Sequence, residues 1–229
     1  MVIDISTDQD GKSGKMKWKV RDLIITGLVM FFLGFIILRI IEHLGLSNNS
    51  IVGSSVEIII LAIGIALLYE KYPLKLFADI STKRVLKYSL IGVIAELLFN
   101  LPKLTISPQD LAGVSKHYAT FLKLGGFDKI FYLFFLCLLG PTFEEILYRG
   151  FVYRILRNRY DIFWGALISS ALFAVIHFYG YDETVFLGIT ALFYVYLYEK
   201  SESILPPIVA HATGNTLLFA FTYWALRGH

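Results

Sequence analysis

Long apolar stretches separated by short polar segments make up most of this chain. A membrane-spanning helix needs about 20 mostly apolar residues. Stretches near or above that length lie at residues 23–41, 51–69, 85–101, 128–157, 162–179, 184–199 and 204–226. The fourth stretch is long enough to form two pieces. The pattern predicts an all-α fold, a polytopic membrane bundle of about seven or eight transmembrane helices.

Composition supports this class of protein. Hydrophobic residues make up 56% and aromatic residues 16% of the 229 residues, and the mean hydropathy is +0.65, values that soluble domains do not reach. The net charge of +3 comes from basic residues beside the apolar stretches rather than from a groove-reading motif, so no nucleic-acid partner is predicted. A single cysteine, Cys137, excludes an intramolecular disulfide and a cysteine-cluster metal site.

The basic residues predict the orientation and the organisation of the chain. Five of them lie just before the first apolar stretch, and more lie in loop 70–84, so we expect a multi-pass protein of the cell membrane with a cytoplasmic N-terminus. The abundance of Ile, Lys, Phe and Tyr indicates a bacterial source. We expect a cytoplasmic tail at 1–21, an anchoring half at 22–127 with a long loop, and a core at 128–229 that holds every chemical motif.

Ionisable side chains interrupt the most apolar third of the chain. They are Glu144, Glu145, Arg149, His177 and His211. A charged group at the centre of a bilayer costs roughly 2.5–3.5 kcal/mol, so these side chains are expected to face one another or a wet cavity. The sequence therefore predicts an intramembrane polar cavity, which is the default location for function.

The segment from Gly140 to Gly150 is the most informative motif. Pro141 is expected to kink the helix or to restart it. Glu145 and Arg149 are four residues apart with the acid first, the favourable order for an ion pair on one helix face. Glu144 points about 100° away and lacks that partner, which leaves it as a candidate general base. The plainer alternative is a cytoplasmic helix end with these side chains in water.

Two later motifs supply imidazole and amide groups. If the chain turns near residues 158–161, an antiparallel hairpin brings His177 to the height of Glu144. His211 and Asn215 are four residues apart and share a side of the last helix, where small residues permit close approach of a neighbour. A packing histidine and ordinary interhelical hydrogen bonds are the alternatives for these two motifs.

Taken together, the motifs resemble the CPBP intramembrane protease family, which includes type II CAAX prenyl endopeptidases and bacteriocin-processing or immunity (Abi) relatives. The family pattern, E-E-x-x-x-R, F-x-x-x-H and H-x-x-x-N, is found between residues 144 and 215, ending at Asn215. The resemblance covers about residues 128–218. It implies an endopeptidase acting on a membrane-associated or lipophilic peptide or protein in the lipid bilayer.

The resemblance also implies roles for the motif residues. Glu144 and His177 would orient and deprotonate a water that attacks a peptide carbonyl. His211 and Asn215 would donate hydrogen bonds to the developing oxyanion, an arrangement that agrees with the chemistry of these side chains. Glu145 and Arg149 would be a supporting ion pair.

Two alternatives to this interpretation stay open. One glutamate and two histidines form a set that suits zinc, but no His-x-x-x-His pair places two ligands on one helix, so a site without a metal cofactor is favoured. The other is a non-proteolytic membrane partner, such as an immunity protein or a regulator of a sensor kinase or transporter. A proton-coupled transporter is disfavoured because the chain has no internal repeat.

Overall fold

The computed structural model describes residues 19–46, 50–72, 81–102, 112–177 and 180–227, and the regular elements in these ranges are all helical. The helices are α1 (Val20–His43), α2 (Ser50–Lys71), α3 (Thr82–Asn100), α4 (Ala112–Lys123), α5 (Gly126–Phe134), η3 (Phe135–Leu139), α6 (Gly140–Glu145), η4 (Ile146–Tyr153), α7 (Arg154–Arg159), α8 (Ile162–Ile176), α9 (Tyr181–Ser201) and α10 (Leu205–Arg227), where η marks a π-helical segment. Each predicted apolar stretch falls on a helix, which confirms the all-α membrane bundle. Most of the predicted N-terminal tail, residues 1–18, lies outside the described residues.

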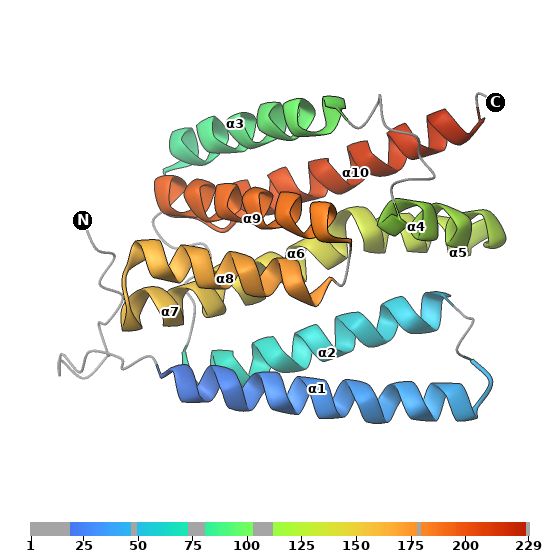
Figure 1. The fold of residues 1–229 in the computed structure, drawn as a ribbon, viewed down its shortest axis with the longest axis horizontal. Helices are drawn as coiled ribbons and strands as arrows, with labels where there is room; N and C mark the ends of the chain where they lie inside the picture. The colour runs from blue at the N-terminus through green and yellow to red at the C-terminus, as the bar shows by residue number, and fades with distance from the viewer. Residues whose placement is uncertain (1–18, 47–49, 73–80, 103–111, 178–179, 228–229) are drawn as a thin grey trace.

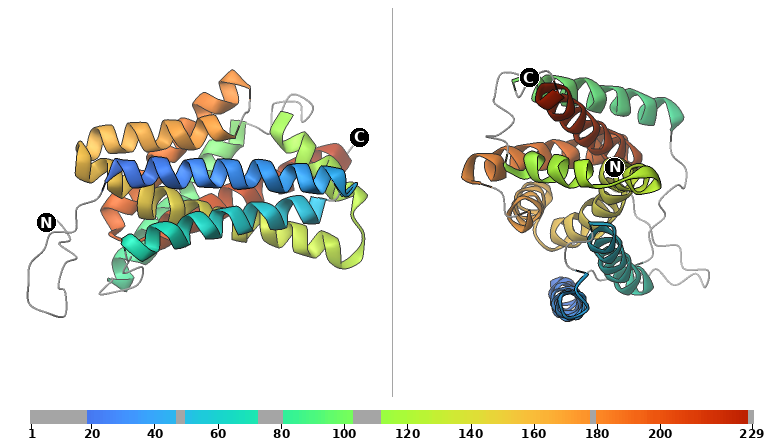
Figure 2. Two further views of the ribbon diagram at one scale, coloured as in Figure 1. Left: turned by 90° about the horizontal axis from the view of Figure 1, so that it is seen from below. Right: turned by 90° about the vertical axis from the view of Figure 1, so that its right-hand side faces the viewer.

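The segments α5 to α7 run on from one another as a single long helix through the middle of the bundle (Figure 1). Helices α1 and α2 pair on one side of it, and α3 lies on the other side against α10 (Figures 1 and 2). Helix α8 packs between the end of this long helix and α9. Among the described residues, three helices are by themselves long and apolar enough to cross a membrane, at Val20–His43, Ile51–Lys71 and Gly126–Arg159.

Helix α1 has the surface of a lipid-facing helix. Large apolar side chains such as Phe31 and Phe32 are exposed, at 66% and 58%, whereas the few buried positions include Asp22 and Thr26. In water this arrangement would be unfavourable, but in a bilayer the outward face contacts lipid and the polar groups find partners inside. Asp22 is one of them, because it accepts hydrogen bonds from Lys71 and Tyr72 at the end of α2.

The helix runs through Pro141 without ending. The helix type changes at the predicted place: the π-helical segment η3 ends at Leu139, and α6 begins at Gly140 with Pro141 in its first turn, so the predicted restart lies within a continuous helix. A second π-helical segment, η4, follows α6. Proline lacks a backbone N–H and clashes with the carbonyl one turn earlier, and a wider π turn relieves both problems. The acidic pair therefore lies between two π-helical segments in the middle of a continuous helix.

The main apolar core lies along η4, α7 and α8 and takes in side chains of α2 and α9. Its most completely buried members include Leu68, Phe151, Ile155 and Phe173. The predicted long loop contributes one short helix, α4, which packs on α10, while residues 103–111 of that loop lie outside the described residues. The core thus fixes the positions of η4 and α8, from which several of the ionisable side chains project.

Candidate active site

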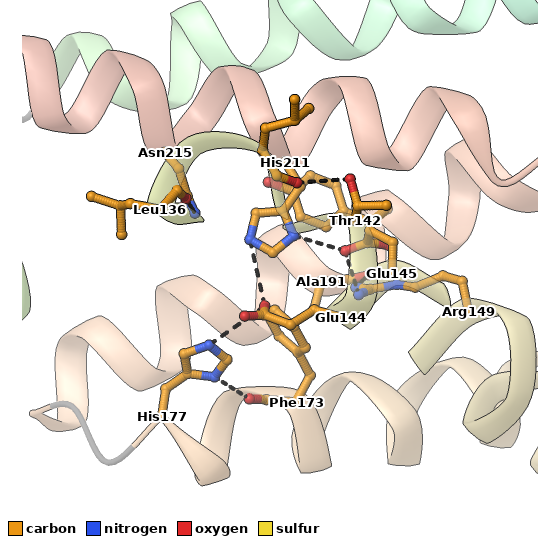
Figure 3. Close-up of polar contacts among 12 residues, drawn as sticks. Leu136, Thr142, Glu144, Glu145, Arg149, Phe173, His177, Ala191, His211 and Asn215 are labelled. Atoms are coloured by element: carbon orange, nitrogen blue, oxygen red, sulfur yellow. Dashed lines mark hydrogen bonds and ion pairs between the residues drawn. The ribbon is translucent and has the colours of Figure 1, made fainter. Parts of the chain in front are cut away.

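The ionisable side chains of the apolar third converge at one place, and they come from three parts of the bundle (Figure 3). Glu144 and Glu145 end α6, His177 caps the C-terminal end of α8, and His211 projects from α10. The predicted hairpin does bring Glu144 and His177 to the same height, because their side chains lie within 4 Å of each other. The convergence follows from two helix pairings, η4 with α8 and α6 with α10.

Glu144 lies between two imidazoles. Its Oε2 atom is 3.8 Å from Nε2 of His177 and 3.8 Å from Nε2 of His211. These distances are too long for direct hydrogen bonds, and Oε2 is buried without a hydrogen-bond partner among the described residues. The side chains of Glu144 and His177 remain 15% and 21% exposed, whereas that of His211 is 7% exposed. One oxygen of Glu144 therefore faces both imidazoles at the more open edge of the cluster.

His177 is oriented by the backbone of its own helix. Its Nδ1 atom lies 2.7 Å from the carbonyl oxygen of Phe173. Because a backbone carbonyl only accepts hydrogen bonds, Nδ1 carries the hydrogen, and in the neutral ring Nε2 then presents a lone pair toward Glu144. Phe173, the phenylalanine of the F-x-x-x-H motif, also contacts the imidazole ring with 4.7 Å between centroids.

Glu145 is the most deeply buried acid of the cluster and binds two of its other side chains. Its side chain is fully buried and accepts a 2.7 Å hydrogen bond from Arg149, which is the predicted i,i+4 ion pair. Arg149 donates a second hydrogen bond to the Ala191 carbonyl on α9, and its guanidinium lies over the rings of Phe173 and Tyr194 at 4.8 and 5.2 Å. The cation is thus held by a carboxylate, a carbonyl and two aromatic faces, as a buried charge requires.

The same carboxylate also orients His211. Its Oε1 atom lies 2.9 Å from Nδ1 of His211. A carboxylate held by Arg149 is an acceptor, so Nδ1 of His211 carries a hydrogen and donates it. This contact fixes which edge of the ring faces Glu144. The link between Glu145 and His211 crosses from α6 to α10, and nothing in the spacing of the two motifs predicts it.

Tyr194 is a member of the cluster that the sequence analysis missed. Its ring stacks on His211 with centroids 5.2 Å apart and an interplanar angle of 28°, and its hydroxyl donates a 2.9 Å hydrogen bond to Glu96 on α3. Asn100 donates to the other oxygen of Glu96. Tyr194 lies in a helix rich in aromatic residues, where no periodicity separates it from Phe193 or its other neighbours.

Asn215 is turned toward the π-helical segment before the acidic pair. Its Nδ2 atom donates a 3.0 Å hydrogen bond to the carbonyl of Leu136 in η3. A π-helical turn leaves carbonyls without their usual partner one turn ahead, so this bond satisfies one of them. The amide nitrogen has a second hydrogen, for which the described residues show no acceptor. Asn215 therefore lies beside the cluster, held by the backbone of η3 rather than by the acids.

We tested the cluster as a metal site. Ligands of a tetrahedral zinc with bonds of about 2.0–2.1 Å lie roughly 3.3–3.5 Å apart, whereas the Glu144 oxygen is 3.8 Å from each histidine nitrogen. Within the part of the chain that the structure describes, no group of three His, Cys, Asp or Glu side chains is arranged to hold a metal ion. In the positions they adopt, the Glu144 oxygen and each histidine nitrogen lie a few tenths of an ångström farther apart than two zinc ligands would, and the site without a metal cofactor stays a prediction.

Comparisons with known proteins find similarity over the segment that holds these residues. The family model for type II CAAX prenyl endopeptidase Rce1-like proteins matches residues 126–217, the segment that supplies every residue of the predicted site. A protein of Bacillus subtilis (strain 168) named "Putative membrane peptidase YdiL" is 32% identical over 94 residues, which are 40% of this chain and 37% of that relative. No solved structure matches the chain.

Over residues 126–217, the segment that carries the polar cluster, the chain is similar to membrane peptidases in general terms. More specifically, the family comparison confirms the resemblance to the CPBP intramembrane proteases, and it does so over residues 126–217. Because the match spans little more than a third of its relative, the activity and substrates of the whole protein are matters for proposal.

Proposed function

We propose that the protein is an intramembrane endopeptidase that hydrolyses a peptide bond by activating water with Glu144 and His177. One observation carries this proposal. Two imidazole nitrogens from different helices approach the same oxygen of Glu144, each at 3.8 Å. Two hydrogen bonds of about 2.8 Å from one water, at a tetrahedral angle, place their partners roughly 4.6 Å apart. The observed separations are too long for direct hydrogen bonds, and a bridging water would require the side chains to move apart by less than an ångström.

In this mechanism the acid is the general base. Glu144 takes a proton from the water as its oxygen attacks the carbonyl carbon of the substrate, and His177 holds the water through its Nε2 lone pair. The new C–O bond gives a tetrahedral oxyanion. When the C–N bond breaks, Glu144 returns the proton to the leaving amine, which restores the carboxylate. No covalent enzyme intermediate is required.

Hydrogen-bond donors on α10 are proposed to stabilise the oxyanion. Glu145 accepts from Nδ1 of His211, so its carboxylate favours a protonated imidazole whose Nε2–H points into the cluster. Asn215 contributes the second hydrogen of its amide, the first being held by Leu136. Donors fixed in advance in a water-poor site stabilise developing charge more than they would in water. The Glu145 and Arg149 pair would be a positioning element that acts through His211.

The substrate is proposed to be a membrane-associated or lipophilic peptide or protein. The reacting groups lie within the bundle, and Glu144 and His177 keep partly exposed side chains through which a peptide could reach them. A chain that meets these groups must itself reside in or on the bilayer. The names of the matched family and relative, a CAAX prenyl endopeptidase and a membrane peptidase, support this class of substrate.

Mass spectrometry of membrane peptides tests the proposal and identifies the substrate together. Cells with the wild-type chain are compared with cells that carry Glu144→Gln, which keeps the size of the side chain and removes the base. The matched control is Glu42→Gln, because Glu42 forms an exposed pair with Arg39 far from the cluster. We expect cleavage products that are present in the wild type and the control and absent in Glu144→Gln.

The opposite result has a clear meaning. If Glu144→Gln is inserted at the wild-type level and leaves both the peptides and the phenotype unchanged, hydrolysis is not the function. The non-proteolytic alternative, a membrane partner protein that acts by binding, then takes its place.

A further inference from the structure

A basic pocket lies far from the candidate active site, at the end of the bundle where α3 begins and α9 ends (Figure 1). It is a wide, shallow depression in the surface, with a volume of about 600 Å³. Four cationic side chains line it together with two acids and Tyr88. The cations are Lys83, Arg84, Lys87 and Lys200, and the acids are Glu199 and Glu202.

The two acids of the pocket already have partners. Glu202 pairs with Arg84 at 2.6 Å, and Glu199 pairs with Arg157 of α7 at 2.9 Å. Glu202 ends α9 in a left-handed conformation, with φ of 57°. The carboxylates that line the cavity are therefore neutralised within the protein.

Three lysines remain around the cavity. Lys83, Lys87 and Lys200 are exposed, and the ion pairs found among the described residues give none of them a carboxylate partner. Lys87 instead lies over the ring of Tyr88 at 5.4 Å. Like charges gathered around one cavity repel each other, and an anion placed between them removes that cost.

The same two helices carry apolar stripes that continue from the cations. On α3, Lys83 and Lys87 are followed on the same face by Leu90, which is 61% exposed. On α9, Lys200 is preceded on its face by Tyr196 and Leu192, which are 44% and 37% exposed. Tyr88 and Tyr196 contact each other edge to face at the junction, where tyrosines of membrane proteins commonly mark the boundary between lipid and water.

We propose that this pocket binds the phosphate of an anionic glycerophospholipid, with the acyl chains lying along the exposed apolar stripes of α3 and α9. The cations alone would suit any phosphate. The continuity between cations, tyrosines and lipid-facing leucines favours a molecule with a charged head and apolar tails. Basic pockets between helices at a membrane surface bind such headgroups in other proteins. This site is independent of hydrolysis, so its failure would leave the proposed peptidase function untouched.

Native mass spectrometry of the full chain in detergent tests this site. Short-tailed phosphatidylglycerol, short-tailed phosphatidylcholine and inorganic phosphate are titrated separately. The test variant is Lys83→Gln/Lys200→Gln. The control variant is Lys123→Gln/Lys129→Gln, which removes the same charge from α4 and α5.

We expect the wild-type chain to bind phosphatidylglycerol at least tenfold more tightly than phosphatidylcholine. A lysine near an anionic surface contributes about fivefold in affinity, so the test variant should bind about 25-fold more weakly and the control within about twofold of wild type. Equal binding of both lipids, or equal loss in both variants, overturns the proposal. Inorganic phosphate that competes fully with phosphatidylglycerol overturns the lipid assignment in favour of a soluble phosphate.

Discussion

Oxygen Oε1 of Glu145 lies 2.9 Å from Nδ1 of His211, which ties the acidic motif of α6 to the imidazole of α10. Arg149 donates to the same oxygen. Glu145 therefore contacts two cationic or protonated groups and has two roles. It balances a buried cation, and it selects the protonation and the orientation of a histidine that faces Glu144.

Replacement of Arg149 by methionine should destabilise the protein strongly. Arg149→Met leaves the fully buried Glu145 with His211 as its remaining charged partner, and breaking a buried pair from one side costs about 3–5 kcal/mol. The midpoint of unfolding by SDS titration measures this loss. Arg39→Met is the matched control, since Arg39 forms an exposed pair on α1 and its loss should change the midpoint little. Equal midpoints for the two variants would show that the buried pair is not needed for the fold.

Glu145→Gln should lower kcat more than it raises KM. A neutral amide can present either its oxygen or its nitrogen to Nδ1 of His211, so the ring is no longer held in one protonation state. Because Arg149 loses its carboxylate, the variant should also be less stable than wild type. For the folded protein we expect kcat to fall on the order of 10²-fold, the lower end of what proton-handling groups contribute. The assay is steady-state cleavage of the substrate peptide by the purified variant. A rise in KM at constant kcat would assign Glu145 to substrate binding instead.

Two substitutions of Tyr194 distinguish the role of its stacked ring from that of its hydroxyl group. Tyr194→Phe keeps the ring stacked on His211 and removes one of the hydrogen bonds that Glu96 accepts, at a cost of about 1 kcal/mol in the free energy of unfolding. Tyr194→Leu also removes the stacked ring. We expect kcat to fall clearly for Tyr194→Leu and to stay within a few-fold of wild type for Tyr194→Phe. Identical kcat values for both variants would mean that the stack does not position His211.

Cleavage by the purified protein should not depend on a metal ion. In the proposed mechanism the protein's own side chains activate the water, so prolonged treatment with a chelator should leave cleavage of the substrate peptide unchanged. The control is a known zinc protease treated in parallel. Loss of activity that zinc restores would replace the proposal with a metal site built on Glu144 and the two histidines.

The helices could be predicted from the sequence because lipid requires long apolar segments, and that requirement is local. The convergence of Glu144, His177 and His211 could be predicted for a related reason. Buried charge is costly in a bilayer, so these side chains were expected to face one another. The antiparallel hairpin between α7 and α8 was predictable from residue counting alone. The family match over residues 126–217 confirmed the predicted family resemblance.

Contacts between helices distant in the sequence could not be predicted in this way. The link from Glu145 to His211, the stacking of Tyr194 and the bond from Asn215 to Leu136 depend on how α6, α9 and α10 are rotated against one another. Spacing within one helix says nothing about that rotation. The π-helical segments on either side of α6 could not be predicted either. A proline indicates that the regular α-helical hydrogen bonding is interrupted, but it does not indicate which helix type the neighbouring residues adopt.

A double-mutant cycle on Glu144 and His177 tests the central claim most directly. Wild type, Glu144→Gln, His177→Gln and the double variant are compared by kcat on the same substrate peptide. If both side chains act on one water, each single variant should lose about 10²–10⁴-fold and the double variant should be hardly slower than the worse single one. Losses that multiply in the double variant would show that the two residues act independently and would contradict the shared water.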